Sequence, residues 1–331
     1  MERPFPKPED KYPVLYLKDT DVPLPKHAIN NKTRYGYFKT VAKGGKCIIQ
    51  SCKDFHLSRI VAYKSLRPEL ANDPYENQRF LREARVTAML QHPNTIPVYE
   101  LSRDTTGNYY FTMKLVQGST LREILNGEAE VDGWRPAPLR RLIDMLIQVC
   151  HALDYAHNHG VVHRDVKPGN ILVGPFGEVL LLDWGLAKVW GMTDEQERDL
   201  TADIESDPSL TGQGKLQGTV PYMSPEQVEE SRDLDHRTDI YSLGAVLYEV
   251  LTGDKMIRPA GLHEMMTAVV TGDIVAPSTR TPERPIPAVL DEICMRCVAR
   301  SPDDRYASAN ELLLALQAWE DTGETPNVPP S

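Results

Sequence analysis

The hydrophobic and polar positions of this 331-residue chain change their period near residue 120. Before that point, short apolar runs typical of β-strands surround one helical stretch. The strand-like runs cover residues 47–52, 60–64 and 109–116, and the helical stretch covers residues 75–90. The pattern predicts a small β-rich lobe with one main helix.

From Leu121 onward the pattern is mainly helical. An apolar stripe from Leu139 to Leu153 repeats at spacings that share one helix face. Residues 239–252 predict a second apolar helix, and Ser308 with Glu311 predicts a capping box at the start of the last one. The second part of the chain is therefore expected to form a larger, mainly helical lobe.

The two ends of the chain differ from the part between them. Residues 1–34 are rich in proline and charge and predict an extended arm, and residues 321–331 predict a flexible polar tail. Residues 35–320 are the predicted folded domain, with an N-lobe at 35–116 and a C-lobe at 117–320. A cleft between two lobes is the natural place for a ligand.

Composition excludes some classes of function. Hydrophobic residues make up 41% and charged residues 25% of the chain, which is ordinary for a soluble globular protein. A formal net charge of −10 argues against nucleic-acid binding as the main function, so no nucleic-acid partner is expected. No apolar run approaches the roughly 18–20 residues of a membrane span, so none is expected in this chain.

The five cysteines favour a reducing compartment over a disulfide framework, which indicates a cytoplasmic location. Cys294 and Cys297 form a Cys-x-x-Cys pattern that could suggest zinc or redox chemistry. The pair lies in a helix-like run without a second cysteine pair nearby, so helix packing is the favoured interpretation.

Polar chemistry is concentrated at residues 163–170, and Asp183-Trp184-Gly185 follows. Apolar runs on either side of the turn residues 174–177 predict an antiparallel hairpin between the two segments. Such a hairpin brings Asn170 beside Asp183. An amide oxygen next to a carboxylate suits a hard cation such as Mg²⁺.

The run His-Arg-Asp-x-Lys-Pro-x-Asn at 163–170, followed by Asp-x-Gly at 183–185, resembles the catalytic and magnesium-binding loops of protein kinases. From about Tyr35 to Trp319 the chain is similar to the eukaryotic-type (Hanks-type) serine/threonine protein kinases of bacteria. The resemblance implies an α+β, two-lobed protein kinase fold. It also implies transfer of the γ-phosphoryl group of ATP to serine and threonine hydroxyls of protein substrates, with Mg²⁺ or Mn²⁺ as the metal.

The resemblance implies catalytic roles for four charged residues. Asp165 would act as the general base or orient the substrate hydroxyl, and Lys167 would stabilise the transferred phosphoryl group. Lys64 would contact the α- and β-phosphates and pair with Glu83. Taken alone, Lys64 could be a solvated strand end and Glu83 an exposed helix charge.

The same resemblance implies a nucleotide site. Its glycine-rich loop corresponds to residues 42–49, where only the middle glycine is kept and Ala42 and Cys47 replace residues that let backbone approach phosphate closely. The predicted nucleotide-binding residues are Ala42, Gly44, Gly45, Ile49, Ala62, Lys64, Met113, Lys114, Val116, Asn170, Leu172 and Asp183. Asn170 and Asp183 would hold the metal.

Other positions match supporting parts of the family pattern. Asp239 would brace the backbone of the 163–170 loop, Glu226 would form a buried ion pair with Arg305, and Trp184 stands where the family usually has phenylalanine. Autophosphorylation is expected between Asp183 and Glu226. The candidate acceptors are Thr201, Ser206, Ser209, Thr211 and Thr219, and Thr211 is favoured.

Two alternatives remain open at this point. The degenerate glycine-rich loop is compatible with a pseudokinase that binds ATP or acts as a scaffold with weak catalysis. The other alternative is a small-molecule phosphotransferase of the antibiotic- or choline-kinase type. Such enzymes generally lack the lysine after the aspartate and the Ser-Pro-Glu segment, which are present here as Lys167 and Ser224-Pro225-Glu226.

Overall fold

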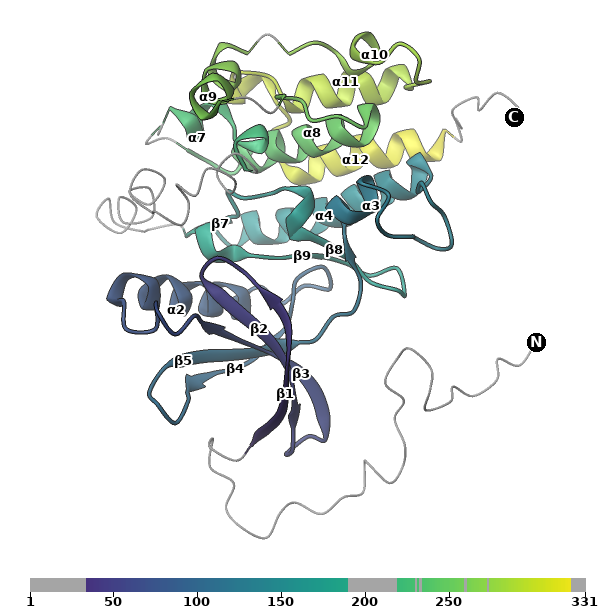
Figure 1. Ribbon diagram of the computed structural model, residues 1–331. Helices are drawn as coiled ribbons and strands as arrows, with labels where there is room; N and C mark the ends of the chain where they lie inside the picture. The colour runs from purple at the N-terminus through teal and green to yellow at the C-terminus, as the bar shows by residue number, and fades with distance from the viewer. Residues whose placement is uncertain are drawn as a thin grey trace, which may run out of the picture. The chain divides into compact units, whose positions relative to one another are not determined.

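The computed structural model describes residues 34–189, 219–229, 231, 234–258, 261–272 and 274–322. The chain divides into two compact units. The first contains the chain up to Asn77 and Tyr99–Leu115, and the second contains Gln78–Val98 and the chain from Val116 onward. The predicted α+β fold, with one β-rich and one mainly helical lobe, is confirmed (Figure 1).

A five-stranded sheet in the order β1-β2-β3-β5-β4 forms the first unit. Its strands are β1 (Tyr35–Lys43), β2 (Cys47–Asp54), β3 (Arg59–Leu66), β4 (Val98–Arg103) and β5 (Tyr109–Lys114). Tyr63 and Tyr110 belong to the core of this unit, and their rings stack with centroids 4.4 Å apart. Cys52 and Val61 pack with these two rings in the same buried cluster.

Helix α2 (Pro74–Met89) runs from the first unit into the second. It begins where the Asp73 carboxylate accepts hydrogen bonds from the backbone N–H groups of Tyr75 and Glu76, at 2.9 and 3.1 Å. Phe80 is buried, as its position on the predicted apolar face requires. The predicted helix is displaced from the observed one by a single residue.

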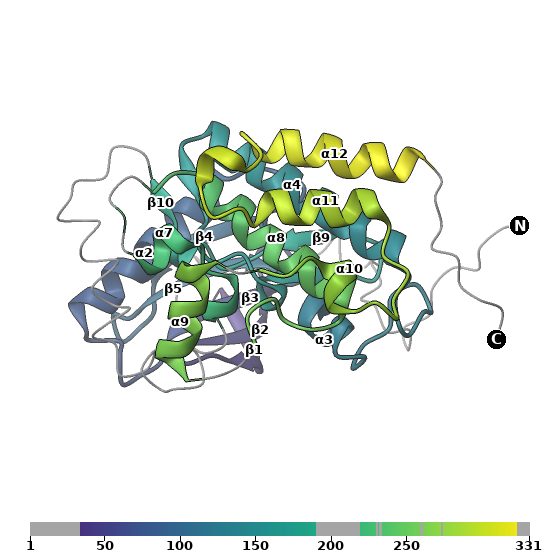
Figure 2. The ribbon, with the colours of Figure 1, turned by 90° about the horizontal axis from the view of Figure 1, so that it is seen from above.

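Helices build most of the second unit and stack in layers (Figures 1 and 2). They are α3 (Leu121–Leu125), α4 (Leu139–Asn158), α7 (Pro225–Val228), α8 (Arg237–Thr252), α9 (Leu262–Thr271), α10 (Pro277–Arg280), α11 (Ala288–Cys297) and α12 (Ala309–Asp321). Helix α4 packs against α12, and α8 packs against α11 and α4. Every residue of α8 from Thr238 to Thr252 is buried, so this helix is the centre of the unit.

Short strands and 3₁₀ turns carry the loops between these helices. The strands are β6 (Ser119–Thr120), β7 (Val161–Val162), β8 (Ile171–Val173), β9 (Val179–Leu181) and β10 (Lys188–Val189). The turns are η1 (Pro168–Asn170), η2 (Trp184–Leu186), η3 (Val220–Tyr222) and η4 (Pro302–Asp304). Strands β6, β8 and β9 form one small sheet, and β7 pairs with β10 in another.

The start of α12 follows the predicted cap in part. The Ser308 hydroxyl accepts a hydrogen bond from the Glu311 N–H at 3.1 Å. The Glu311 carboxylate accepts its bond from the Ala307 N–H at 2.7 Å, one residue before the position that a capping box requires.

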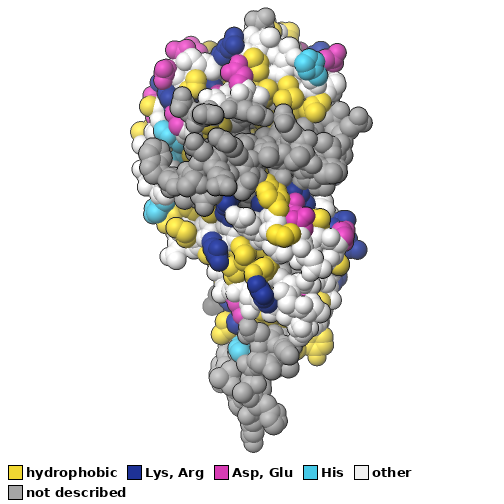
Figure 3. Space-filling view, turned by 90° about the vertical axis from the view of Figure 1, so that its left-hand side faces the viewer, with side chains coloured by type: hydrophobic (Ala, Val, Ile, Leu, Met, Phe, Trp, Pro, Cys, Tyr) yellow, Lys and Arg dark blue, Asp and Glu magenta, His cyan; other side chains and the backbone are white. Residues whose placement is uncertain are grey.

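Within the described ranges, no helix combines the length and the apolar character that crossing a membrane requires. The face of the molecule in Figure 3 carries both cationic and anionic side chains among its described residues. This face therefore presents mixed charge.

Candidate active site

Asp165, Lys167 and Asn170 form one hydrogen-bonded cluster in the polar loop (residues 163–170). Lys167 Nζ donates to the two carboxylate oxygens of Asp165 at 2.8 and 2.7 Å. Asn170 Nδ2 donates to the carbonyl oxygen of Asp165 at 2.8 Å and to its Oδ2 at 2.9 Å. The structure thus brings together three of the residues predicted from the sequence.

Burial raises the pKa of Asp165 above its usual value, because the carboxylate loses the water that stabilises its charge. The Lys167 ammonium opposes this rise, and the negative charge of Asp183 adds to it. The pKa remains raised after these effects. A raised pKa makes the Asp165 carboxylate a better proton acceptor.

Thr219 reaches the same cluster from the start of η3. Lys167 Nζ donates to Thr219 Oγ1 at 3.0 Å. The Lys167 ammonium therefore lies between a carboxylate and a hydroxyl.

Asp183 follows the β8–β9 hairpin, in which Ile171 pairs with Leu181. The Leu182 N–H donates to the carbonyl oxygen of Asn170 at 2.8 Å, so Asn170 faces Leu182 and Asp183 is the next residue. The predicted pairing of Asn170 with Asp183 is therefore wrong by one residue, since Leu182 lies opposite Asn170. The backbone of Asp183 is left-handed, with φ 65° and ψ 71°, and turns the chain out of the strand.

Glu83 approaches the Asp183-Trp184-Gly185 segment from α2. A Cβ atom on Gly185 would lie 3.2 Å from Asp183 Oδ1 and 3.8 Å from Glu83 Oε2. The glycine therefore gives two carboxylates room at the same point. Glu83 is 9% exposed, as predicted for a carboxylate on the apolar side of its helix. Its predicted partner Lys64 belongs to the other unit, and their pairing remains a prediction.

His163 and Trp184 pack together under the polar loop. Their ring centroids are 4.5 Å apart at 60°, and Trp184 is 1% exposed. His163 Nδ1 accepts a hydrogen bond from the Asp165 N–H at 3.1 Å, and its Nε2 is 3.0 Å from the carbonyl oxygen of Leu182. His163 therefore supports the loop through both ring nitrogens, and the buried Trp184 packs against it.

Asp239 braces the polar loop from α8. Its carboxylate accepts hydrogen bonds from the backbone N–H groups of His163 and Arg164, each at 2.8 Å. His157 Nε2 lies 2.8 Å from Asp239 Oδ2, a contact that the sequence did not predict. The sequence feature that could have indicated this contact is the histidine that follows the apolar stripe of α4.

In the first unit, strand pairing aligns the predicted nucleotide residues. Ala42 pairs with Ile49, and Ile49 pairs in turn with Lys64. On the next strands, Ala62 pairs with Met113. Lys114 ends β5, while Val116 and Leu172 are half-buried residues of the second unit. How the residues of the two units combine remains a prediction.

Gly44 and Gly45 lie in the tight turn between β1 and β2, where the Gly44 N–H donates to the carbonyl oxygen of Cys47 at 2.9 Å. A Cβ atom at Gly44 would lie 3.4 Å from that oxygen, which is an ordinary contact. The turn itself therefore does not require glycine at position 44.

Two further networks anchor η3 and α7. Arg305 donates to both carboxylate oxygens of Glu226, at 2.6 and 2.8 Å, and this confirms the predicted ion pair. Arg122 contacts both Glu249 and the Tyr222 hydroxyl, and that hydroxyl donates to Glu249 at 2.7 Å. The second network was missed, although a glutamate within an otherwise apolar helix was a signal for it.

Cys294 and Cys297 are fully buried in α11, and burial raises the pKa of both thiols well above the usual value. Cys294 Sγ lies 3.6 Å from the carbonyl oxygen of Gly244. In the part of the chain that the structure describes, no group of three or more His, Cys, Asp or Glu side chains is arranged to hold a metal ion. Helix packing accounts for the cysteine pair.

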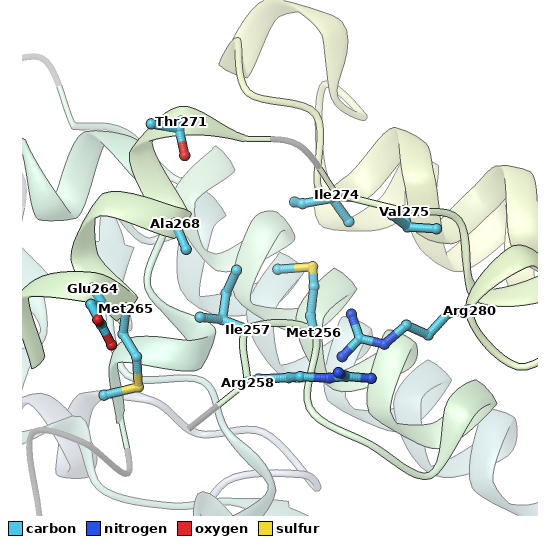
Figure 4. A pocket seen from close by; sticks show the side chains of 10 residues that line it. All are labelled: Met256, Ile257, Arg258, Glu264, Met265, Ala268, Thr271, Ile274, Val275 and Arg280. Carbon is cyan, nitrogen blue, oxygen red and sulfur yellow. The ribbon is translucent and has the colours of Figure 1, made fainter. Parts of the chain in front are cut away.

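A separate cavity of about 350 Å³ lies in the second unit beside α9 (Figure 4). Apolar side chains such as Met256 and Met265 line it, together with Arg258, Glu264 and Arg280. None of the residues predicted for the candidate active site lines this cavity.

The predicted acceptors Thr201, Ser206, Ser209 and Thr211 lie outside the described residues.

A family model for the protein kinase domain matches residues 35–315. The chain is 36% identical over 295 residues to serine/threonine-protein kinase PknD of Protochlamydia amoebophila (strain UWE25), covering 86% of this chain and 30% of that protein. It is 36% identical over 307 residues to serine/threonine-protein kinase PknB of Mycolicibacterium smegmatis, covering 89% and 44%. It is 34% identical over 302 residues to serine/threonine-protein kinase PknD of Chlamydia trachomatis serovar D, covering 86% and 31%. The chain thus spans less than half the length of these curated relatives.

Proposed function

Since the chain belongs to the protein kinase family, we propose that it is an ATP-dependent serine/threonine protein kinase. The observation that carries this proposal is the cluster of Asp165, Lys167 and Asn170, with Thr219 in contact with the lysine. Phosphoryl transfer depends mainly on positioning and on charge stabilisation, and this cluster supplies both. The relatives are named as protein kinases, which gives the pseudokinase and small-molecule alternatives no support.

In the proposed reaction, a serine or threonine hydroxyl oxygen of the substrate bonds to the γ-phosphorus of ATP, and the bond from that phosphorus to the ADP oxygen breaks. Asp165 orients the hydroxyl and accepts its proton, which its raised pKa favours. Lys167, between Asp165 and Thr219, stabilises charge on the transferred phosphoryl group.

A magnesium ion, or manganese in its place, would be held by Asn170 and Asp183. The donor set fits such an ion, because Asn170 uses its amide nitrogen toward Asp165 and retains its amide oxygen. An amide oxygen and a carboxylate are ligands that hard cations prefer. When bound, the ion would neutralise phosphate charge.

We propose that the remaining predicted residues bind the nucleotide, with Lys64 and Glu83 as the pair for the α- and β-phosphates. The other members are Ala42, Gly44, Gly45, Ile49, Ala62, Met113, Lys114, Val116 and Leu172. The row Ala42, Ile49 and Lys64 on neighbouring strands supports this assignment.

We also propose residues 35–320 as the kinase domain, between the arm at 1–34 and the tail at 321–331. Its partners would be proteins that present serine or threonine, and Thr211 would be its own first site of phosphorylation. A cytoplasmic location is proposed because all five cysteines are free of disulfides.

Incubation of the purified chain with Mg-ATP and a generic protein substrate tests the assignment. Asp165→Asn and Asp183→Asn should each lower phosphate incorporation at least about 100-fold, because each removes a charge needed in the transition state. Asp303→Asn is the control, since it removes a carboxylate that is 87% exposed. Equal incorporation by wild type, Asp165→Asn and Asp183→Asn would contradict the proposal.

A further inference from the structure

A lysine–glutamate pair joins the turn between β1 and β2 to helix α2. Lys46 Nζ lies 2.7 Å from Glu76 Oε1. The two side chains are only 18% and 11% exposed. A partly buried pair of this kind is less screened by water than an exposed one. The contact therefore holds the turn more firmly than an ordinary surface ion pair.

The backbone of Lys46 is held as well as its side chain. The Arg67 N–H donates to the Lys46 carbonyl oxygen at 2.8 Å, just beyond the end of β3. The Gly44 N–H closes the turn on the Cys47 carbonyl oxygen at 2.9 Å. We name residues 43–47 the nucleotide turn, since they lie within the predicted glycine-rich loop. Lys46 links this turn both to β3 and to α2.

Glu76 shares a face of α2 with Glu83. The two residues are seven positions apart in one continuous helix, which is about two turns and roughly 10 Å along the axis. Phe80 lies between them on this face and is 2% exposed. One side of the helix thus carries the carboxylate that holds the nucleotide turn and the carboxylate that reaches Gly185. A displacement of the helix moves both.

We propose that Lys46 and Glu76 are positioning residues that couple the nucleotide turn to helix α2, so that ATP binds more tightly when α2 is in place. The proposal rests on the proposed kinase function. The family's first and third glycine positions are Ala42 and Cys47 here, so the close backbone approach that glycine allows is reduced. The ion pair between Lys46 and Glu76 fixes the position of the turn without relying on glycine at these two positions.

Four variants test the coupling. Lys46→Met and Glu76→Gln each remove one partner, Lys46→Glu places two carboxylates together, and the Lys46→Glu/Glu76→Lys double variant restores an ion pair in reverse. Lys39→Met is the matched control, because it removes the same charge from an exposed position of β1 outside the nucleotide turn. It reports how far the loss of a nearby charge alone weakens ATP binding.

Lys46→Met and Glu76→Gln should raise the KM for ATP by about threefold to tenfold, with kcat within about twofold of wild type. Lys46→Glu should raise this KM further, and the reversed pair should bring it back to within about twofold of wild type. Lys39→Met should change it by less than about twofold. An unchanged KM in Lys46→Met, or a failure of the reversed pair to improve on Lys46→Glu, would overturn the coupling.

Hydrogen exchange without nucleotide gives a readout that does not depend on activity. The Gly44 and Arg67 amides should exchange faster in Lys46→Met and Glu76→Gln than in wild type and Lys39→Met. Unchanged exchange overturns the proposal, and so does faster exchange with an unchanged KM for ATP. A wild type that binds no Mg-ATP contradicts the proposed function itself, whereas these exchange rates report on the ion pair alone.

Discussion

At the scale of single residues, Asp239 holds the polar loop in place with one fully buried carboxylate. Burial alone would raise its pKa. The hydrogen bond from His157, the electrostatic effect of the two nearby histidine side chains and the hydrogen bond from the His163 backbone N–H outweigh burial and hold the pKa of Asp239 below its usual value. The folded protein therefore favours the ionised form of Asp239.

Asp239→Asn should destabilise the protein by about 3 kcal/mol at pH 7, because the amide nitrogen of asparagine cannot accept a backbone hydrogen bond. A depressed folded pKa contributes stability above the unfolded value of about 4, and this contribution is lost as pH falls through the folded pKa. The difference between wild type and variant should therefore shrink below about pH 4. Urea unfolding at several pH values measures it.

Asp154→Asn is the control for this experiment, because the Asp154 carboxylate on α4 accepts an exposed hydrogen bond from the side chain of Asn158 at 3.2 Å. Its effect should stay below about 0.5 kcal/mol at every pH. A constant difference between wild type and Asp239→Asn from pH 7 to pH 3 would show that the ionisation of Asp239 is not the source of its stability.

The sequence predicted single residues best where local spacing determines the contact. Lys167 lies two positions after Asp165, so their hydrogen bonds needed only the loop motif. His157 and Asp239 are far apart in the chain and meet because α4 packs against α8. No local spacing reports such a packing contact, and the role of His157 was missed for this reason.

At the scale of elements, Arg305 connects η4 to α7 and α8. Its guanidinium donates to Glu226 in α7 and to the carbonyl oxygen of Arg237 at the start of α8. The side chain is fully buried, and it also donates to the carbonyl oxygens of Ala299 and Arg300. Arg305 therefore links α7 to the start of α8 and to the segment that precedes η4.

Arg305→Met should lower the free energy of unfolding by about 3–5 kcal/mol, because it leaves the Glu226 carboxylate without its cation. Arg296→Met is the matched control, since Arg296 is 47% exposed in its pair with Glu311 and should cost less than about 1 kcal/mol. Denaturant unfolding compares the two variants. Equal losses would contradict the role assigned to burial.

Boundaries of the predicted strands and helices mostly agree with the observed ones to about two residues, and the errors have physical causes. Helix α2 begins at Pro74 because Asp73 caps it. The hairpin prediction placed Asp183 beside Asn170, whereas Leu182 lies opposite Asn170. Apolar Leu182 continues the pattern of β9, although the strand pairing ends at Leu181. Hydrophobic pattern indicates which side chains are buried, while backbone pairing decides where an element ends.

At the scale of the whole molecule, the predicted site residues are divided between two units. Ala42, Ile49 and Lys64 lie in the first unit, and Asp165 and Asn170 lie in the second. Within the first unit, strand pairing aligns Ala42, Ile49 and Lys64. Within the second, a hydrogen bond joins Asn170 to Asp165. Each group follows from a short sequence motif and its local structure. The pairing of Lys64 with Glu83 depends on both units, and it therefore stays a prediction.

Mg-ATP should stabilise the protein against heat if the proposed nucleotide site is formed. A ligand that binds only the folded state at about 100 times its Kd adds about 2.7 kcal/mol to the free energy of unfolding. Differential scanning fluorimetry should show a rise in Tm for wild type and for Asp303→Asn, and a smaller rise for Asp183→Asn. No rise for wild type at millimolar Mg-ATP would contradict nucleotide binding by this chain.

Cys47 occupies one of the two positions where the nucleotide turn lacks the family glycine, and it is the one partly exposed cysteine of the five in the chain. The other four thiols are buried, so a mild alkylating reagent added to the folded protein meets a single accessible sulfur atom. That sulfur is a natural attachment point for a covalent inhibitor or a fluorescent reporter. A kinase with glycine at this position has no thiol there and would not react at this site.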